Sequence, residues 1–157
     1  MPVERLLVAT ARPRILASVR RQARPGTIGE LITTSGVWDA MKACGIKSTG
    51  HNVVVYWDEA GKDLMHSPGG IPVDIGAEIL EPFTGGAELN CTETPAGPFI
   101  TALHRGHYRH LGETYDAIIG YCRREGLTLA GPYWEYYGHH SDDEDQLETD
   151  VCMLLQR

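Results

Sequence analysis

Three chemically active side chains stand two residues apart late in the sequence, at Tyr133, Glu135 and Tyr137. On a β-strand such residues share one face, which leaves Trp134 and Tyr136 on the other. A carboxylate removed from water is costly unless partners compensate it, and two phenols can donate hydrogen bonds to it. Their rings can also contact a cation, so the row suits an aromatic, acidic slot for a lipophilic cation. The alternative places Glu135 in solvent and Trp134 and Tyr136 in the core.

Other candidate chemistries find less support. His104, His107 and His110 are spaced by three, and His139–His140 precede four nearby acids, but catalytic zinc needs three well-placed ligands and an open position. Without an HExxH motif, we interpret these histidines as helix-start and hairpin residues and expect no metal. The absence of a GxSxG elbow and of a glycine-rich phosphate loop leaves serine-hydrolase and nucleotide chemistry unsupported, so no cofactor is expected. Four separated cysteines without a C-x-x-C pair indicate reduced thiols.

Composition narrows the class of partner. The 157 residues carry a formal net charge of −7, whereas phosphate contacts need a basic face, so we expect no direct nucleic-acid binding. The early arginines and the acidic stretch 142–150 are interpreted as a strand edge and a solvated loop. The sequence contains no apolar run of about 18 residues and no signal peptide. We therefore expect no membrane partner and a cytoplasmic protein.

Hydrophobic periodicity predicts the elements that position these residues. The order strand, helix, strand, strand occurs twice, and Gly45 and Gly126 end the two helices. A loop over 82–95 separates the halves. The predicted elements are a strand over 6–22 bent at Pro13, a helix over 28–44, strands over 52–57 and 73–80, a strand over 99–103, a helix over 108–125, and strands over 133–137 and 149–155.

The two halves also match residue by residue. Residues 45–57 overlay 126–138 at a constant offset, which puts Val54 on Glu135. With small gaps, Ile15–Arg21 overlays Phe99–Arg105, and Asp74 overlays Asp150. We therefore predict one α+β domain over residues 1–157, a pseudo-twofold duplication of a βαββ unit over about 5–81 and 96–157. We expect an antiparallel sheet, two main helices and a central groove at the joint of the repeats, where a ligand would bind.

This symmetry extends the candidate site. Tyr56 should mirror Tyr137, and Asn52 should mirror Tyr133, while Val54 takes the position that mirrors Glu135. The groove should therefore be acidic on one side only. Trp38 on the first helix and Tyr115 on the second are candidate wall residues, and the alternative for both is ordinary packing between helix and sheet.

Three segments resemble the GyrI-like effector-binding domains, also called AraC-type or bacterial transcription activator effector-binding domains. Residues 131–137 resemble the G-P-x-x-E-x-Y strand of that family, and residues 104–111 resemble its H-x-G-x-Y-x-x-L segment. Residues 148–155 resemble its closing T-E/D-x-x-x-P-L strand, although Leu154 stands where proline is usual. The resemblance covers nearly the whole chain.

The resemblance implies a groove for amphipathic, often cationic, small molecules and favours Glu135 facing inward. Many members are fused to a DNA-binding helix-turn-helix, for which no residues remain here, so we expect a free-standing sensor or sequestering protein, with a protein partner or a homodimer as a further option. One alternative is a hydrolase of cyclopropane-type toxins, in which Glu135 activates water and Tyr137 or Tyr56 donates a proton. Another is a gyrase-inhibitor-like protein binder.

Overall fold

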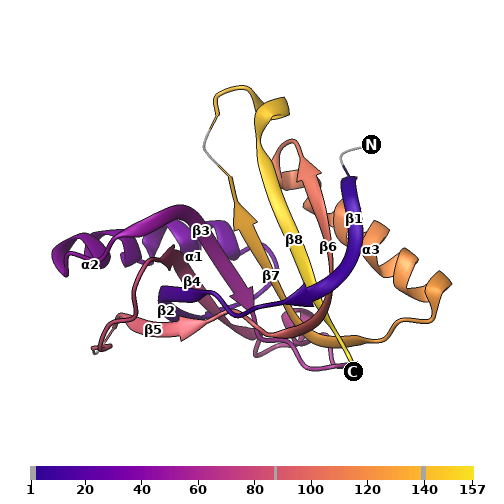
Figure 1. Cartoon of the computed structure of the whole chain (residues 1–157), viewed down its shortest axis with the longest axis horizontal. Coiled ribbons are helices and arrows are strands. Elements are labelled where there is room, and N and C mark those ends of the chain that lie inside the picture. The colour runs from indigo at the N-terminus through magenta and orange to yellow at the C-terminus, as the bar shows by residue number, and fades with distance from the viewer. Residues whose placement is uncertain (1–2, 87, 139–140) are drawn as a thin grey trace.

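A computed structural model describes residues 3–86, 88–138 and 141–157. These residues form eight strands, three α-helices and three short 3-10 helices (Figure 1). None of the helices is long and apolar enough to cross a membrane. The strands are β1 Val3–Ala11, β2 Ile15–Ala23, β3 Ser48–Tyr56, β4 Ile71–Ile79, β5 Asn90–Glu93, β6 Gly97–Arg105, β7 Leu129–Tyr137 and β8 Glu148–Leu155. The helices are α1 Ile28–Thr34, α2 Val37–Ala43 and α3 Leu111–Glu125, with 3-10 helices η1 Leu64–His66, η2 Tyr108–His110 and η3 Glu144–Gln146.

All eight strands belong to one antiparallel sheet in the order β1-β6-β8-β7-β3-β4-β2-β5. The predicted βαββ units are therefore β2-α1/α2-β3-β4 and β6-α3-β7-β8, and they meet where β3 pairs with β7. In that ladder Val54 pairs with Glu135, the residue on which the repeat overlay places it. The pseudo-twofold axis consequently passes through this pair, at the centre of the sheet.

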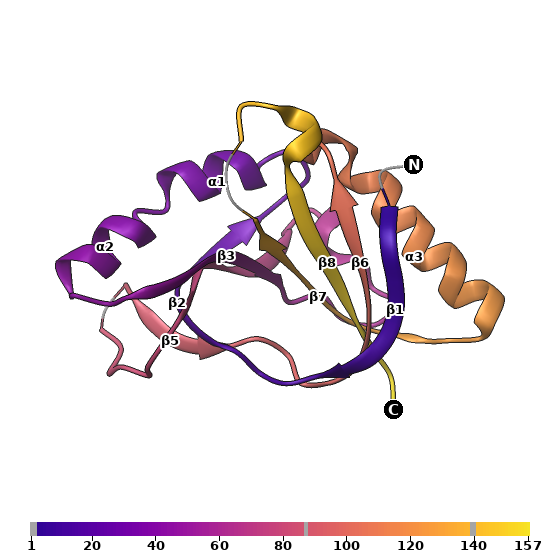
Figure 2. The ribbon, with the colours of Figure 1, turned by 45° about the horizontal axis from the view of Figure 1, so that its top comes forward.

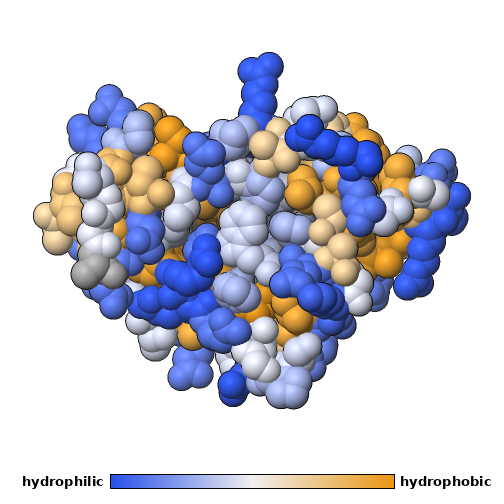
Figure 3. All heavy atoms as spheres, turned by 90° about the horizontal axis from the view of Figure 1, so that it is seen from below, coloured by the Kyte–Doolittle hydropathy of each residue, from blue (hydrophilic) through white to orange (hydrophobic). Residues whose placement is uncertain are grey.

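Helices cover one face of the sheet. α1 and α2 pack on the β2–β4 half, and α3 packs on the β6–β8 half (Figure 2). Side chains alternate between the two faces of the sheet along each strand. Val54 points to the helix side, whereas Val53 and Val55 belong with Trp134 to a cluster on the opposite face. On the face seen from below in Figure 3, charged and polar residues are interspersed with small apolar patches, as on most folded proteins.

Several sequence predictions need correction. The bent strand over 6–22 is two strands, β1 and β2, that lie in different halves of the sheet. The first helix is two short helices, because Gly36 between them adopts a φ of 72° that interrupts helical geometry. The predicted loop over 82–95 contains β5, which pairs with β2. The helix ends at Gly45 and Gly126 are confirmed, both with a positive φ.

The overlay of Ile15–Arg21 on Phe99–Arg105 is wrong by one residue. It puts Ala17, which lies in the helix-side core, on Thr101, which lies on the opposite face beside Cys152. In the ladders Arg20 pairs with Asp74 and Leu103 pairs with Asp150, so the true counterpart of Ala17 is Ile100, in the helix-side core under α3.

Candidate functional site

A cavity of about 560 Å³ lies between the two repeats on the helix side of the sheet. The central strands β3 and β7 supply its floor, with Ile75 and Gly76 of β4 at one edge. Residues of α1 and α2 form one wall, and η2 with the first turns of α3 forms the other. The volume is within the range of sites that bind drug-sized molecules. The helix-side residues that line it are Ile28, Gly29, Ile32, Trp38, Tyr108, Leu111, Gly112 and Tyr115.

Glu135 lies on the floor of this cavity and is only 3 % exposed. Three phenols donate hydrogen bonds to its carboxylate. Tyr115 contacts Oε2 at 2.6 Å, Tyr56 contacts Oε1 at 3.2 Å, and Tyr137 also contacts Oε1. Burial raises the pKa of Glu135, while the three phenol hydrogen bonds oppose that rise. The buried negative charge is thus compensated by dipoles and not by a cationic side chain among its hydrogen-bond partners.

The same environment keeps the phenols protonated. Burial, followed by the charge of Glu135, raises the pKa of Tyr56, Tyr115 and Tyr137 well above its ordinary value. Tyr133 packs behind them, with its ring stacked on Tyr56 at 4.6 Å between centroids and edge-on to Tyr115 at 5.4 Å. This packing holds the donors in place around the carboxylate.

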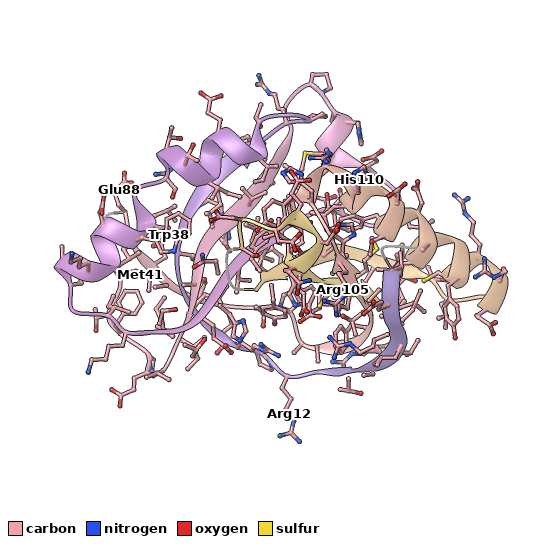
Figure 4. All side chains as sticks on the ribbon, turned by 90° about the horizontal axis from the view of Figure 1, so that it is seen from above. Arg12, Trp38, Met41, Glu88, Arg105 and His110 are labelled. Atoms are coloured by element: carbon pink, nitrogen blue, oxygen red, sulfur yellow. The ribbon has the colours of Figure 1, made fainter. Side chains whose placement is uncertain are left out.

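Two partly exposed aromatic residues line the cavity, one from each wall. Trp38 on α2 is 37 % exposed, and its indole N–H donates to Asn52 Oδ1 at 2.9 Å (Figure 4). The rings of Tyr108 in η2 and Tyr137 lie nearly perpendicular to each other, with their centroids 5.6 Å apart. Each ring therefore has one edge anchored to the floor and offers apolar area to a bound molecule.

The sequence-predicted site residues can now be located. Six of the seven line this one cavity: Glu135, Tyr137, Tyr56, Trp38, Tyr115 and Asn52. Tyr133 does not line it, because its ring stacks against Tyr56. Sequence reasoning missed Tyr108, Leu111 and the α1 residues Ile28 and Ile32. Tyr108 falls inside the segment 104–111 that carried the family resemblance, so its signal was present.

The spaced histidines have structural roles where the structure describes them. His104 is fully buried, its Nδ1 lies 2.6 Å from the Thr114 hydroxyl, and its Nε2 lies 3.0 Å from the His107 carbonyl oxygen. Because only an N–H can pair with that carbonyl, Nε2 carries a proton, and His104 connects β6 to α3. His139 and His140 lie outside the described residues. Within the described ranges, no three His, Cys, Asp or Glu side chains gather as metal ligands.

Comparison with known proteins bears on this arrangement. A family model for the GyrI-like small molecule binding domain matches residues 10–156. The crystal structure of the EcmrR C-terminal domain is similar, with a TM-score of 0.78 at 17 % identity over 98 % of each chain. In an EcmrR–DNA complex, the match has a TM-score of 0.78 at 18 % identity and covers all of this chain but 59 % of EcmrR.

Two further structures have the same fold. SAV2435 bound to tetraphenylphosphonium matches with a TM-score of 0.62 at 11 % identity, over 97 % of this chain and 94 % of that one. A hydrolase encoded by lin2189 from Listeria innocua matches with a TM-score of 0.61 at 12 % identity, over 99 % and 93 %. No curated protein matches the sequence.

Proposed function

The chain belongs to the GyrI-like family of small-molecule-binding domains, and from that premise we propose that it binds an amphipathic aromatic cation in the cavity between its repeats. One observation carries the proposal. The carboxylate of Glu135 lies buried on the floor of a cavity that is walled by aromatic and aliphatic side chains. Such a site offers apolar contact area together with a preference for positive charge.

The electrostatics favour a cation whose charge is spread over rings. Attraction between opposite charges is several times stronger in a partly dry site than in water. A strongly hydrated ammonium would lose its water on entry, whereas a lipophilic cation loses little hydration and gains the hydrophobic contacts of Ile28, Ile32 and Leu111. The faces of Trp38 and Tyr108 would add cation–π attraction.

The asymmetry of the floor favours one positive charge per ligand. Val54 pairs with Glu135 across the pseudo-twofold axis, so the first repeat contributes an apolar side chain where the second contributes a carboxylate. A dication would leave one charge on apolar surface. We therefore expect monocations to bind better than dications of similar size.

Two ions of matched shape and opposite charge test the proposal. Tetraphenylphosphonium, which the SAV2435 structure holds, should bind in calorimetry and move the Trp38 indole N–H resonance in nuclear magnetic resonance spectra. Tetraphenylborate should bind at least ten times more weakly, because its charge is repelled by Glu135. Equal binding of the two ions, or binding that leaves the Trp38 resonance unmoved, would refute the proposal.

For the cellular role we propose a sensor or a sequestering protein without direct contact to nucleic acid. The net charge of −7 supports this proposal, because DNA binding depends on a basic face. EcmrR is found in a complex with DNA, but there this chain matches only 59 % of the protein. An electrophoretic mobility assay with duplex DNA at low salt should show no shift, with or without tetraphenylphosphonium.

Hydrolysis is a second candidate, supported by one feature of the geometry. A buried carboxylate and two phenols surround the same space, and the similar Listeria innocua protein is described as a hydrolase. In that reaction Glu135 would accept a proton from water that opens a strained ring, and Tyr137 or Tyr56 would protonate the product oxygen. Three phenols already occupy lone pairs of Glu135, which favours binding over base catalysis. Mass spectrometry of a cyclopropane-bearing alkylator should therefore show no added water; accumulation of the hydrated product would favour the hydrolase.

A further inference from the structure

A second cavity, of about 440 Å³, lies on the face of the sheet opposite to the helices. Its floor comes from outward-facing side chains of β6, β7 and β8, and the segment that connects β1 to β2 forms its rim. Figure 2 shows this segment crossing from one half of the sheet to the other. Among the described residues that line this outer cavity, Asp150 is the only carboxylate, and Arg12 and Arg14 line it as well.

The repeat symmetry gives Asp150 a counterpart in the first half. Asp74 pairs with Val55 in the β3–β4 ladder, and Asp150 pairs with Tyr136 in the β7–β8 ladder. Val55 and Tyr136 occupy equivalent positions in the overlaid repeats, so the two aspartates are equivalent as well. This agreement supports the sequence overlay of Asp74 on Asp150.

In the first repeat, that aspartate is fully neutralised. Asp74 is 2 % exposed and accepts two hydrogen bonds from Arg20, from Nε at 2.6 Å and from Nη2 at 3.0 Å. The indole N–H of Trp57 donates a third at 2.7 Å. A planar guanidinium and an aromatic N–H group therefore fill the space around this carboxylate.

Both donors are missing in the second repeat. Leu103 faces Asp150 across the ladder, as Arg20 faces Asp74, and Gly138 follows Tyr137 as Trp57 follows Tyr56. Among the ion pairs of the described residues, Asp150 takes part only in one with Arg5, at 3.9 Å, in which the Asp150 side chain is 50 % exposed and that of Arg5 67 %. An exposed pair at that distance contributes little. Asp150 is therefore a half-buried carboxylate beside space that donors occupy in the other repeat.

One ring of the outer cavity is open to a flat group. Phe99 is half-buried and stacks on Trp134, which is only 1 % exposed, with ring centroids 5.7 Å apart. Beside them, the guanidinium of Arg14 lies 4.2 Å from the centre of the Tyr136 ring and covers its face, so the surface of Phe99 is the one left for a bound ring.

The other charges near the rim leave Asp150 available. Arg14 Nε lies 3.7 Å from Glu78 Oε2, so a carboxylate other than Asp150 stands beside this cation. Arg12 lines the cavity, and its side chain projects away from the molecule (Figure 4). Burial raises the pKa of Asp150 and the nearby arginines Arg5 and Arg14 lower it, so a paired cation would relieve a charge that the fold leaves half-compensated.

We propose that the outer cavity binds a small planar compound with an amidinium or guanidinium group, whose N–H donors pair with Asp150 and whose flat body lies against Phe99. The bound group would donate hydrogen bonds to Asp150, as Arg20 and Trp57 donate them to Asp74. The inference does not depend on the inner cavity, which lies on the other face of the sheet.

Benzamidine is a suitable probe, with neutral benzamide and anionic benzoate as matched compounds. The indole N–H resonances of Trp134 and Trp38 report on the outer and inner cavities separately. Benzamidine should shift the Trp134 resonance, and it should do so equally in the Glu135→Gln protein. Benzamide should bind about ten times more weakly or more, because charge-assisted hydrogen bonds are roughly twice as strong as neutral ones.

Two variants move the affinity in opposite directions. Asp150→Asn should weaken benzamidine binding about tenfold or more, while Arg5→Gln should tighten it about twofold to fivefold by removing a competing cation. Arg5 is mostly exposed, so its replacement should leave the fold intact. Absence of benzamidine binding, unchanged affinity in Asp150→Asn, tighter binding of benzoate, or shifts confined to Trp38 would each overturn the proposal.

Discussion

Replacement of Glu135 by glutamine isolates the charge of the inner cavity. The amide keeps the size of the carboxylate, which is buried and hydrogen-bonded to Tyr56, Tyr115 and Tyr137. One phenol must then accept from the new NH₂ group, because an amide has a single acceptor oxygen. The net effect on the free energy of unfolding should be small, about 1 kcal/mol in either direction, since the variant also removes a buried charge.

The effect on cation binding should be much larger. At a separation of about 6 Å and an effective dielectric constant of about 20, two unit charges attract by about 2.8 kcal/mol. Part of that attraction offsets desolvation of the ligand, so the loss should be about 2.0 to 2.7 kcal/mol. Tetraphenylphosphonium should therefore bind the Glu135→Gln protein about 30- to 100-fold more weakly.

Isothermal titration calorimetry at pH 7.5 measures this loss directly. Glu125→Gln is a matched control, because it removes the same charge from an exposed position at the end of α3. The control should bind within about twofold of the original chain, since surface charges are screened. If folded Glu135→Gln protein binds within threefold of the control, the electrostatic argument for the site is wrong.

Three further predictions concern pH and stability. Burial raises the pKa of Glu135, so tetraphenylphosphonium should bind most tightly above that pKa, where the carboxylate is charged. Its affinity should fall as the pH is lowered through that pKa, and the fall should begin above the usual pKa range of glutamate. Calorimetry that finds pH-independent affinity contradicts this. Gly76→Ala should lower the free energy of unfolding in urea by about 3 kcal/mol, because its Cβ would lie 1.8 Å from the Ala17 carbonyl oxygen; a loss below 1 kcal/mol contradicts it. Arg20→Ala should cost about 2 kcal/mol by leaving Asp74 buried with one donor, and an unchanged urea midpoint would contradict that.

Much of the fold could be predicted from local pattern. Alternation along a strand assigns each side chain to one of two faces, so the sequence alone places Tyr133, Glu135 and Tyr137 on one face and Trp134 and Tyr136 on the other. The residue-by-residue match of the halves predicted the duplication and a groove at the joint of the repeats, whereas the pairing of β3 with β7 at that joint is a finding of the structure. Local geometry also sufficed where glycine adopts a positive φ at a helix end.

Errors arose where pairing depends on distant parts of the chain. β1 and β2 look like one strand around Pro13 because their alternation is continuous, yet β1 pairs with β6 and β2 pairs with β4 and β5. β5 has only four residues, too few for a pattern, and exists because the edge of β2 offers it backbone hydrogen bonds. Strand pairing of this kind has no local signature.

By itself the sequence determined which residues share a face, that the unit is doubled, and that one carboxylate lacks a counterpart across the axis. Tertiary structure alone decided that a third phenol, Tyr115 on α3, reaches Glu135, that Tyr133 turns behind Tyr56, and that Asp150 borders open space. The physical reason is that periodicity specifies direction from the backbone, whereas hydrogen-bond partners and cavities depend on how elements far apart in the chain pack together.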